Sequence, residues 1–452
     1  MHGTVDRVGA RVRTLLWLAW PIIVSRSAQV VVGLADALMV AHLGETALAA
    51  TTTGAMNAYS LFILPMGIVF IVSSFSAQFF GRGEPEGARR YAYYGLAVAL
   101  GTQLVCLAGI PFLEGPLGVF GFSPAVRELI HTYLSIRLIS AGAVIALEAL
   151  ANYYGGLGNT RLPMIANLFA MVLNVIGNWL LIDGNLGFPA LGVAGAAWAS
   201  TFSTVLACAG LFAAFLRDGR RFGAMLPRLQ GRELLRMLRF GLPSGFNWFF
   251  EFFAFIFFVN VVVAGLGTTA LAALMSVIQL NSVSFMPAFG LASAGAIIVG
   301  QAIGARALSE VPRAVRLTFL LASGWQVAVG LTYLLLPRLA FAPFARGDGA
   351  GALLEVGARM LTLSAAWQLF DSAATTLAEA LRAAGDTAFT LWARLALAWA
   401  VFVPGSFYTV RVLQAGETGA MWWLVAYLGL LAGILFLRFR TGAWRRIQLV
   451  EG

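Results

Sequence analysis

The chain has 452 residues, of which 60% are hydrophobic and only 11% are charged, and its mean hydropathy is +0.84. These values exclude a soluble globular domain and indicate a polytopic helical membrane protein with room for about a dozen spans. The net charge is +10, yet the chain contains arginine and no lysine. A Walker A loop and a Schiff-base cofactor both require lysine, so an ATPase of that type and a pyridoxal phosphate or retinal protein are excluded. We expect no cofactor, and energy for transport would come from an ion gradient or a partner chain.

Apolar runs bounded by glycine, proline and arginine predict twelve transmembrane helices. The first six are expected at 15–41, 51–80, 91–113, 125–153, 162–183 and 191–216, and the second six at 234–264, 270–300, 313–336, 351–381, 387–411 and 418–438. The longest polar segment, RDGRRFGAMLPRLQGRE, lies between the two sets. We therefore predict an N-terminal lobe at 1–216, a cytoplasmic linker at 217–233 and a C-terminal lobe at 234–452.

Arginines gather on one side of this predicted topology. With twelve spans, that side receives both termini, the linker, Arg382 and Arg394, whereas the other side receives few arginines, such as Arg137 and Arg359. Loops rich in arginine stay in the cytoplasm. The distribution predicts a multi-pass membrane protein with cytoplasmic N- and C-termini, and it explains the positive charge without a nucleic-acid partner.

The second half of the chain repeats the first. LGETALAA at 43–50 matches LGTTALAA at 266–273, and the same spacing relates Gly67 to Gly290. Because both halves hold six spans and begin on the same side, we expect two six-helix lobes related by a pseudo-two-fold axis along the membrane normal. Duplicated bundles also occur in channels and scaffolds, so the repeat alone leaves those classes open.

The first predicted lobe carries polar residues at membrane depth. Asp36 lies about 33 Å along the first span, and Asn174 and Asn178, four residues apart on one helix face, lie about 20 to 26 Å along the fifth. This overlap predicts a second ion or proton site, although asparagines also join transmembrane helices without any ion. Arg26 either mirrors an acid of the second lobe or neutralises a carboxylate such as Glu148.

The second predicted lobe contains two acids at matching depth. Glu251 and Asp371 each lie about 16 Å from the cytoplasmic end of their span. A charge at that depth costs roughly 2.5 to 3.5 kcal/mol, so it is kept where a partner or a cavity receives it. If the two helices face one another, the acids could hold Na⁺ through their oxygens or share a proton. The alternatives are a protonated Glu251 that joins helices by a hydrogen bond and an Asp371 that pairs with an arginine.

Aromatic and amide side chains surround these acids in the sequence. They could line a cavity that binds a hydrophobic cation by cation-π contact, although such residues more often pack or face lipid. The predicted cavity residues are Trp248, Phe252, Phe255, Gln279, Asn281 and Gln368.

The sequence contains few residues that could support an enzyme function. The three histidines, His2, His42 and His131, are scattered near termini or loop edges, without an H-E-x-x-H motif or an aspartate-rich diphosphate motif. The sequence therefore favours neither zinc hydrolysis nor prenyl transfer.

The combination of these motifs resembles the multidrug and toxic compound extrusion (MATE) transporters over nearly the whole chain. The resemblance is carried by Pro21 with Asp36, LGETALAA, NVIGNWLLIDGNLGFPALGVAGAAWAS from Asn174 to Ser200, GLPSGFNWFFE ending at Glu251, and LRAAGDT at 381–387. The presence of both Glu251 and Asp371 is more similar to the NorM branch than to the DinF branch, which lacks the acid in span seven. Archaeal relatives with a Na⁺ site in the first lobe have aspartate where this chain has Asn178.

The resemblance implies a V-shaped pair of lobes that exports hydrophobic, often cationic compounds in exchange for inward Na⁺ or H⁺. We accordingly predict a monomeric, cation-coupled multidrug antiporter that works by alternating access, with small organic cations and membrane lipid as its partners. Two other classes stay open from the sequence. One is a lipid-linked oligosaccharide flippase of the same superfamily, and the other is a non-transporting scaffold or receptor.

Overall fold

A computed structural model describes residues 2–119, 121–221, 228–345 and 350–450. The described residues form helices and no strand, which confirms the all-α, polytopic membrane architecture. The part of the predicted linker at 222–227 lies outside the described residues.

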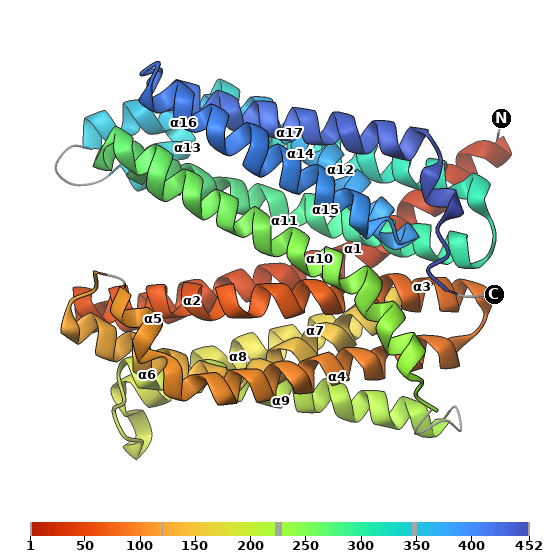
Figure 1. The fold of residues 1–452 in the computed structure, drawn as a ribbon, viewed down its shortest axis with the longest axis horizontal. Helices are drawn as coiled ribbons and strands as arrows, with labels where there is room; N and C mark the ends of the chain where they lie inside the picture. The colour runs from red at the N-terminus through yellow and green to blue at the C-terminus, as the bar shows by residue number, and fades with distance from the viewer. Residues whose placement is uncertain (1, 120, 222–227, 346–349, 451–452) are drawn as a thin grey trace. The chain divides into compact units, whose positions relative to one another are not determined.

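The longest elements are α-helices, and several of them are joined by short 3₁₀ turns (Figure 1). The elements up to residue 221 are α1 (His2–Val40), η1 (Ala41–Leu43), α2 (Glu45–Phe70), α3 (Val72–Arg82), α4 (Pro85–Gly109), η2 (Ile110–Phe112), α5 (Glu114–Val119), α6 (Pro124–Leu138), α7 (Ala141–Gly156), α8 (Arg161–Asp183), η3 (Asn185–Gly187) and α9 (Val193–Arg221). Those that follow are α10 (Gly231–Phe257), η4 (Phe258–Val263), η5 (Ala264–Leu266), α11 (Thr268–Gly304), η6 (Leu308–Glu310), α12 (Val311–Leu335), α13 (Pro337–Phe341), η7 (Ala342–Phe344), α14 (Ala350–Ala384), α15 (Thr387–Ala396), η8 (Leu397–Phe402), α16 (Val403–Arg411), α17 (Gly416–Arg440) and η9 (Ala443–Arg446).

Many helices of the chain are long and apolar enough to cross a membrane. The described residues contain 10 helical segments long and apolar enough to cross a membrane, and α6 with α7, bent by 49°, would make 11 if the pair forms one span. Helix α14 covers the predicted span at 351–381 with 35 residues but is not among them. Twelve spans therefore stay a prediction.

The chain folds into two compact units. Val24–Gly245 form one, here called the N-terminal unit, and Met1–Ile23 with Phe246–Gly452 form the other, the C-terminal unit. The predicted lobes follow chain order, whereas both unit boundaries fall inside a helix, within α1 and within α10. Each boundary lies two or three residues beyond a proline, Pro21 in α1 and Pro243 in α10. A proline inside a helix removes one backbone hydrogen bond and favours a bend there.

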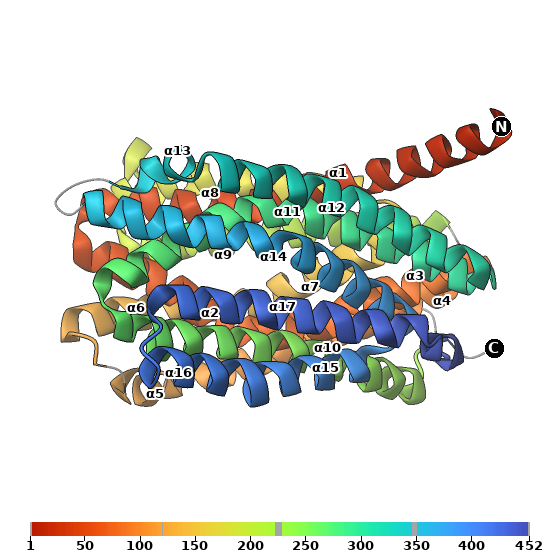
Figure 2. The ribbon, with the colours of Figure 1, turned by 90° about the horizontal axis from the view of Figure 1, so that it is seen from above.

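Within each unit, neighbouring helices bury apolar side chains. In the N-terminal unit α4 packs on α7, α2 on α6, and α8 on α9 (Figure 1), over a core that includes Ile130 and Ile145. In the C-terminal unit α14 lies along α11, α12 and α17 (Figure 2), and the core includes Phe258, Phe341 and Met360. Burial of an apolar side chain of this size contributes roughly 1.5 to 3 kcal/mol.

The sequence repeat has a counterpart in the turns that precede α2 and α11. Gly44 has φ 104° and ψ 172°, and Gly267, at the repeat spacing, has φ 105° and ψ 169°. Only glycine adopts such angles readily. At the same spacing, Gly83 (φ 78°) corresponds to Arg306 (φ 59°), so the second repeat places an arginine in left-handed backbone.

Repeat-related glycines also allow close helix approaches inside each unit. A Cβ on Gly67 of α2 would lie 2.6 Å from the Cα of Gly245 in α10, and a Cβ on Gly290 of α11 would lie 2.4 Å from Cγ1 of Ile23 in α1. Only a residue without a side chain fits at such contacts. The spacing that relates Gly67 to Gly290 therefore reflects the same structural need in both halves.

Two wide π-helical turns interrupt long helices of the C-terminal unit. One is η4, which follows α10, and the other is η8, which follows α15. The turns pack together, since the rings of Phe258 and Phe402 lie 4.9 Å apart between centroids. Arg411 donates a hydrogen bond of 2.9 Å from Nη2 to the backbone oxygen of Val261 in η4. Turns of this kind are frequent at functional sites.

Candidate functional site

In the N-terminal unit, Asp36 of α1 is buried at the centre of a polar cluster. Asn174 and Asn178 donate from Nδ2 to Oδ1 of Asp36 at 3.0 and 2.6 Å, and Ser200 donates from Oγ to Oδ2 at 2.9 Å. All four side chains are at most 6% exposed. We call these four residues the Asp36 cluster.

The helices α8 and α9 hold this cluster in place. Asn174 and Asn178 are four residues apart and therefore share one face of α8. Between them, Gly177 lets α9 approach, because a Cβ there would lie 3.0 Å from that of Ala199. The predicted overlap in depth of Asp36 with both asparagines agrees with this contact, whereas Ser200 was not among the predicted site residues.

The cluster presents hydrogen-bond donors to the carboxylate. Three donors on two oxygens stabilise the ionised acid. The charge of Arg137 acts on Asp36, but in the described structure Asp36 makes no ion pair. Oδ1 of Asn178 is buried and finds no hydrogen-bond partner among the described residues. The cluster therefore contains one acid that no cation neutralises directly and one unused acceptor beside it.

A second buried acid of the N-terminal unit, Glu148 of α7, is neutralised by an arginine. Arg26 of α1 donates from Nη2 to Oε1 of Glu148 at 2.6 Å and from Nη1 to Oε2 at 3.3 Å. The Glu148 side chain is 6% exposed, and Asn152 donates to its Oε1 at 3.1 Å. Of the two roles left open for Arg26, the structure shows the one that neutralises Glu148.

In the C-terminal unit, Glu251 of α10 pairs with Arg394 of α15. Nη1 of Arg394 contacts Oε2 of Glu251, and the side chains are 14% and 40% exposed, respectively. The charge of Arg394 also acts on Asp371 of α14 and on Tyr427 of α17. The Tyr427 hydroxyl and Nε of Arg394 are buried, and the described part of the chain offers neither of them a hydrogen-bond partner. We call Glu251, Asp371, Arg394 and Tyr427 the Glu251 cluster.

The sequence-based topology assigned Arg394 to the cytoplasmic side because it lies about 10 Å beyond the first residue of α15. The structure places it against Glu251, inside a segment of spanning length, a contact that the sequence did not predict. The side of the membrane stays a prediction. The signal in the sequence was an arginine within the apolar stretch LWARLALAW, seven residues inside a predicted span.

Asp371 begins a chain of buried amide and hydroxyl groups. Gln326 of α12 donates from Nε2 to Oδ2 of Asp371 at 3.3 Å, and Ser284 donates to Oε1 of Gln326 at 3.3 Å. Ser284 also lies 3.5 Å from Oε1 of Gln368, whose Nε2 donates to Oδ1 of Asn281. These polar side chains connect the predicted residues Asn281 and Gln368 with Asp371.

The other predicted cavity residues do not converge in the same way. Trp248 packs edge to face on Phe289, and Phe252 packs in the same manner on Phe253. Phe255 packs against the apolar core, and Gln279 is exposed. The drug cavity therefore stays a prediction.

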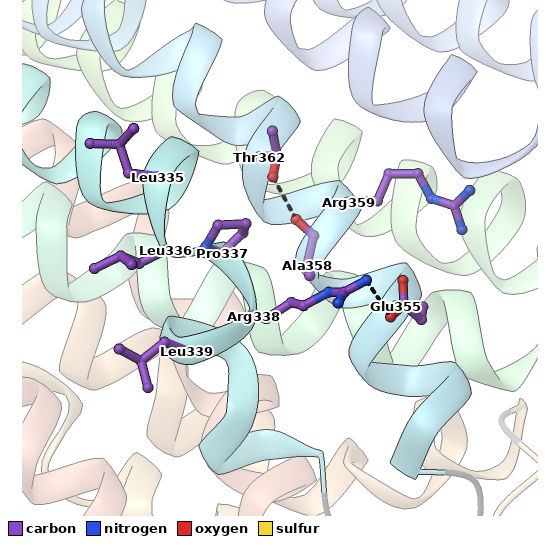
Figure 3. Close-up of a pocket in the computed structure, with 9 residues that line it drawn as sticks. All are labelled: Leu335, Leu336, Pro337, Arg338, Leu339, Glu355, Ala358, Arg359 and Thr362. Carbon is purple, nitrogen blue, oxygen red and sulfur yellow. Dashed lines mark hydrogen bonds and ion pairs between the residues drawn. The ribbon is translucent and has the colours of Figure 1, made fainter.

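A hollow of about 570 Å³ lies elsewhere, where α12, α13 and α14 meet (Figure 3). Arg338 and Glu355 form an ion pair of 2.8 Å at its edge, and the side chains are 70% and 59% exposed. None of the predicted site residues lines it. The exposed ion pair and wide opening make it a surface depression and not the predicted cavity.

A metal-binding cluster of at least three histidine, cysteine, aspartate or glutamate side chains does not occur among the described residues. The Na⁺ site predicted at Glu251 and Asp371 would rely on two acids, amide oxygens and hydroxyls, as hard cations take oxygen ligands. It stays a prediction.

Comparisons with known proteins give consistent matches along the chain. The sequence profile of the family described as MatE matches residues 21–180 and 243–406. A probable multidrug resistance protein NorM of Pseudomonas putida is 29% identical over 97% of this chain and 95% of that protein. A protein of the same description from Geobacillus kaustophilus is 29% identical over 96% of this chain and 95% of its own length.

A solved structure shows the same fold. It is that of a multidrug resistance MATE family transporter of the MOP superfamily in an outward-facing conformation, with a TM-score of 0.87 and 22% identity. The similarity covers 97% of both chains.

Proposed function

We propose a function from the premise that the chain belongs to the MatE family of transporters, whose profile matches well over half of it. The protein exports small organic molecules, including organic cations, across the inner membrane in exchange for a cation that enters. The relatives named as multidrug resistance proteins support this substrate class. Because the family consists of transporters, its match does not support a non-transporting scaffold or an enzyme.

The observation that carries the coupling mechanism is the Asp36 cluster. A buried carboxylate in a membrane-length helix, held by neutral donors alone, changes its charge when it binds a cation. Arginine-paired acids such as Glu148 already have their counter-charge. Asp36 is therefore the acid of the N-terminal unit that can gain and release a coupling ion.

The arrangement of donors favours a proton at Asp36. Na⁺ needs oxygen lone pairs, whereas Asn174 and Asn178 present amide N–H groups to the carboxylate. A proton on Asp36 turns one oxygen into a donor, and a half-turn of the Asn178 amide would offer its unused Oδ1 as the acceptor. Both asparagines would have to reorient to bind Na⁺.

Coupling requires that the two conformations of the transporter bind the proton with different affinity. In the outward-facing state Asp36 takes a proton from outside, the donors rearrange and the substrate is released. In the inward-facing state the proton leaves and the carboxylate regains its three donors. A coupling ion supplies about 2.3 kcal/mol per charge for each 100 mV of membrane potential.

The test is transport by the purified protein in proteoliposomes with a fluorescent organic cation. We expect efflux with a pH gradient in the absence of Na⁺ and no efflux with a Na⁺ gradient at fixed pH. The reverse result would replace the proton by Na⁺, and the absence of transport under both gradients would contradict the proposed exchange.

A further inference from the structure

The two acids of the C-terminal unit, Glu251 and Asp371, have a positive charge of the protein itself, Arg394, beside them. This charge affects which ion the two acids can bind. Glu251 and Asp371 together would place two negative charges in one membrane-embedded cluster. Like charges in such surroundings force one acid to stay neutral or draw a cation into the site. A guanidinium is already there, in contact with Glu251.

The properties of arginine make this cation permanent. A guanidinium does not lose its proton in proteins, and its donors match a carboxylate. Arg394 is held by packing, with only 14% of its side chain exposed, so it occupies the site with little freedom. Asp371, on α14 of the same unit, accepts a hydrogen bond from Gln326 and forms no ion pair among the described residues, so Arg394 is the cation that the cluster contains.

We propose that Arg394 is a built-in cation that neutralises Glu251 and takes the place of a bound Na⁺ at this acid pair. One carboxylate, Asp371, is then left to exchange a single proton. Glu251 becomes a positioning residue that holds Arg394, and not a residue that binds the coupling ion. The proton exchanged by Asp371 rests on the proposed function, whereas the role of Arg394 does not.

The charge balance of the cluster supports a single exchangeable ion. Two carboxylates and one guanidinium carry one net negative charge, which one proton on Asp371 removes. A Na⁺ that bridged both acids would lie beside the guanidinium and meet a like charge at short range. Without the guanidinium, the two carboxylates would offer a monovalent cation their own oxygen ligands.

The first experiment measures Na⁺ binding by thermal unfolding of the purified full-length protein in detergent. Na⁺ is exchanged for choline at constant ionic strength. We expect no Na⁺-dependent shift in wild type or in Arg394→Lys, which keeps the charge. In Arg394→Gln we expect Na⁺ to raise the melting temperature by about 2 °C or more, because a ligand that binds only the folded state stabilises it.

Two results would overturn the inference. One is a saturable Na⁺-dependent shift in wild type that Asp371→Asn abolishes, because Na⁺ and Arg394 would then share the site. The other is an Arg394→Gln protein that is folded and gains no Na⁺ response.

A double-mutant cycle gives a second readout in variants that fold; if Arg394→Gln does not fold, the Na⁺ response of wild type, with Asp371→Asn as its control, still decides. We expect Glu251→Gln and Arg394→Gln each to reduce proton-driven efflux roughly tenfold or more, since each leaves one partner unneutralised. The double variant Glu251→Gln with Arg394→Gln should lose less than either single variant. A loss in the double variant equal to the product of the single losses would mean that the residues act independently, and the inference would be wrong.

The two readouts separate this inference from the proposed function. If wild type transports nothing under either gradient, the proposed exchange fails, while the Na⁺ response of Arg394→Gln in detergent still tests the role of Arg394. If wild type transports with a pH gradient and Arg394→Gln stays indifferent to Na⁺, the inference fails and the exchange stands.

Discussion

The two units neutralise a membrane-embedded glutamate with an arginine, but the polarity of the pair is reversed between them. In the N-terminal unit the first helix, α1, supplies the cation Arg26, and Glu148 comes from α7. In the C-terminal unit the repeat-related helix, α10, supplies the anion Glu251, and Arg394 comes from α15. The repeat thus keeps a charge at nearly the same point of the first helix while its sign changes.

The comparison shows that a counter-charge matters more than which helix carries it. Each unit also has an aspartate, Asp36 in α1 and Asp371 in α14, that accepts hydrogen bonds from neutral donors and forms no ion pair in the described part of the chain. Neutralised glutamates suit a structural role, and aspartates bound by neutral donors suit an ion that comes and goes. The difference predicts that the aspartates exchange the coupling ion and that each glutamate holds an arginine in place.

The largest expected effect is on transport, through Asp36→Asn. The variant keeps a hydrogen-bonding side chain of the same size but cannot bind a proton, so we expect proton-driven efflux to fall roughly hundredfold or more. Efflux of a fluorescent cation from proteoliposomes measures the loss. Asp183→Asn, at the exposed end of α8 where Asp183 contacts His42, is the matched control and should transport like wild type. Efflux of Asp36→Asn at the wild-type rate would remove Asp36 from the coupling mechanism.

The next effect is on stability and compares the two ion pairs. Glu148→Gln removes the 6% exposed carboxylate that neutralises the partly buried Arg26, which we expect to cost about 3 to 5 kcal/mol. Glu251→Gln should cost clearly less, because Glu251 is 40% exposed and the charge of Asp371 still acts on Arg394. Thermal unfolding in detergent measures both, with the exposed Glu84→Gln as control. Equal losses would show that the pairs are alike despite their different exposure.

A smaller effect concerns the wide turn η4, which occurs in the C-terminal unit after α10. Arg411→Ala removes the donor to the Val261 carbonyl, and we expect a loss of about 1 kcal/mol. Hydrogen exchange followed by mass spectrometry should show faster exchange in peptides that cover η4. An unchanged exchange rate there, beside a lower melting temperature, would place the effect of Arg411 elsewhere.

The smallest effect compares the repeats at one backbone position. Arg306 has a positive φ where the first repeat has Gly83, so Arg306→Gly should relieve strain and raise stability by up to about 1 kcal/mol. The reciprocal change, Gly83→Arg, should lower stability by a similar amount. Thermal unfolding of both variants provides the test, and shifts of the same sign would contradict the shared turn.

The predicted depth of residues along their helices was enough to predict that part of the site lies together. Spacing places Asn174 and Asn178 on one face of α8, and counting residues gives a depth that overlaps that of Asp36. The sequence also predicts the helical membrane architecture, because spanning helices must satisfy every backbone group internally and therefore require long apolar runs. These predictions depend on local periodicity and length alone.

The partners of Glu251 could not be found in the same way. Arg394 lies on α15, more than 140 residues later, and its rotation about that helix depends on the packing of α10, α14 and α17. The rule that sorts arginines to one side of the membrane counts charges near helix ends and is silent on an arginine inside a span. The unit boundaries inside α1 and α10 are likewise a property of packing, which follows no sequence marker beyond Pro21 and Pro243.

Each of the two π-helical turns adds one extra residue to a helix that carries a member of the Glu251 cluster. Glu251 lies seven residues before η4, and Arg394 lies three residues before η8. Because an α-helix turns by about 100° per residue, moving the extra residue of a π turn along its helix rotates the intervening side chains by about that angle. Such a step requires no unfolding, since the hydrogen bonds are exchanged one at a time. A shift of either π turn past Glu251 or Arg394 would therefore turn that side chain relative to its partner.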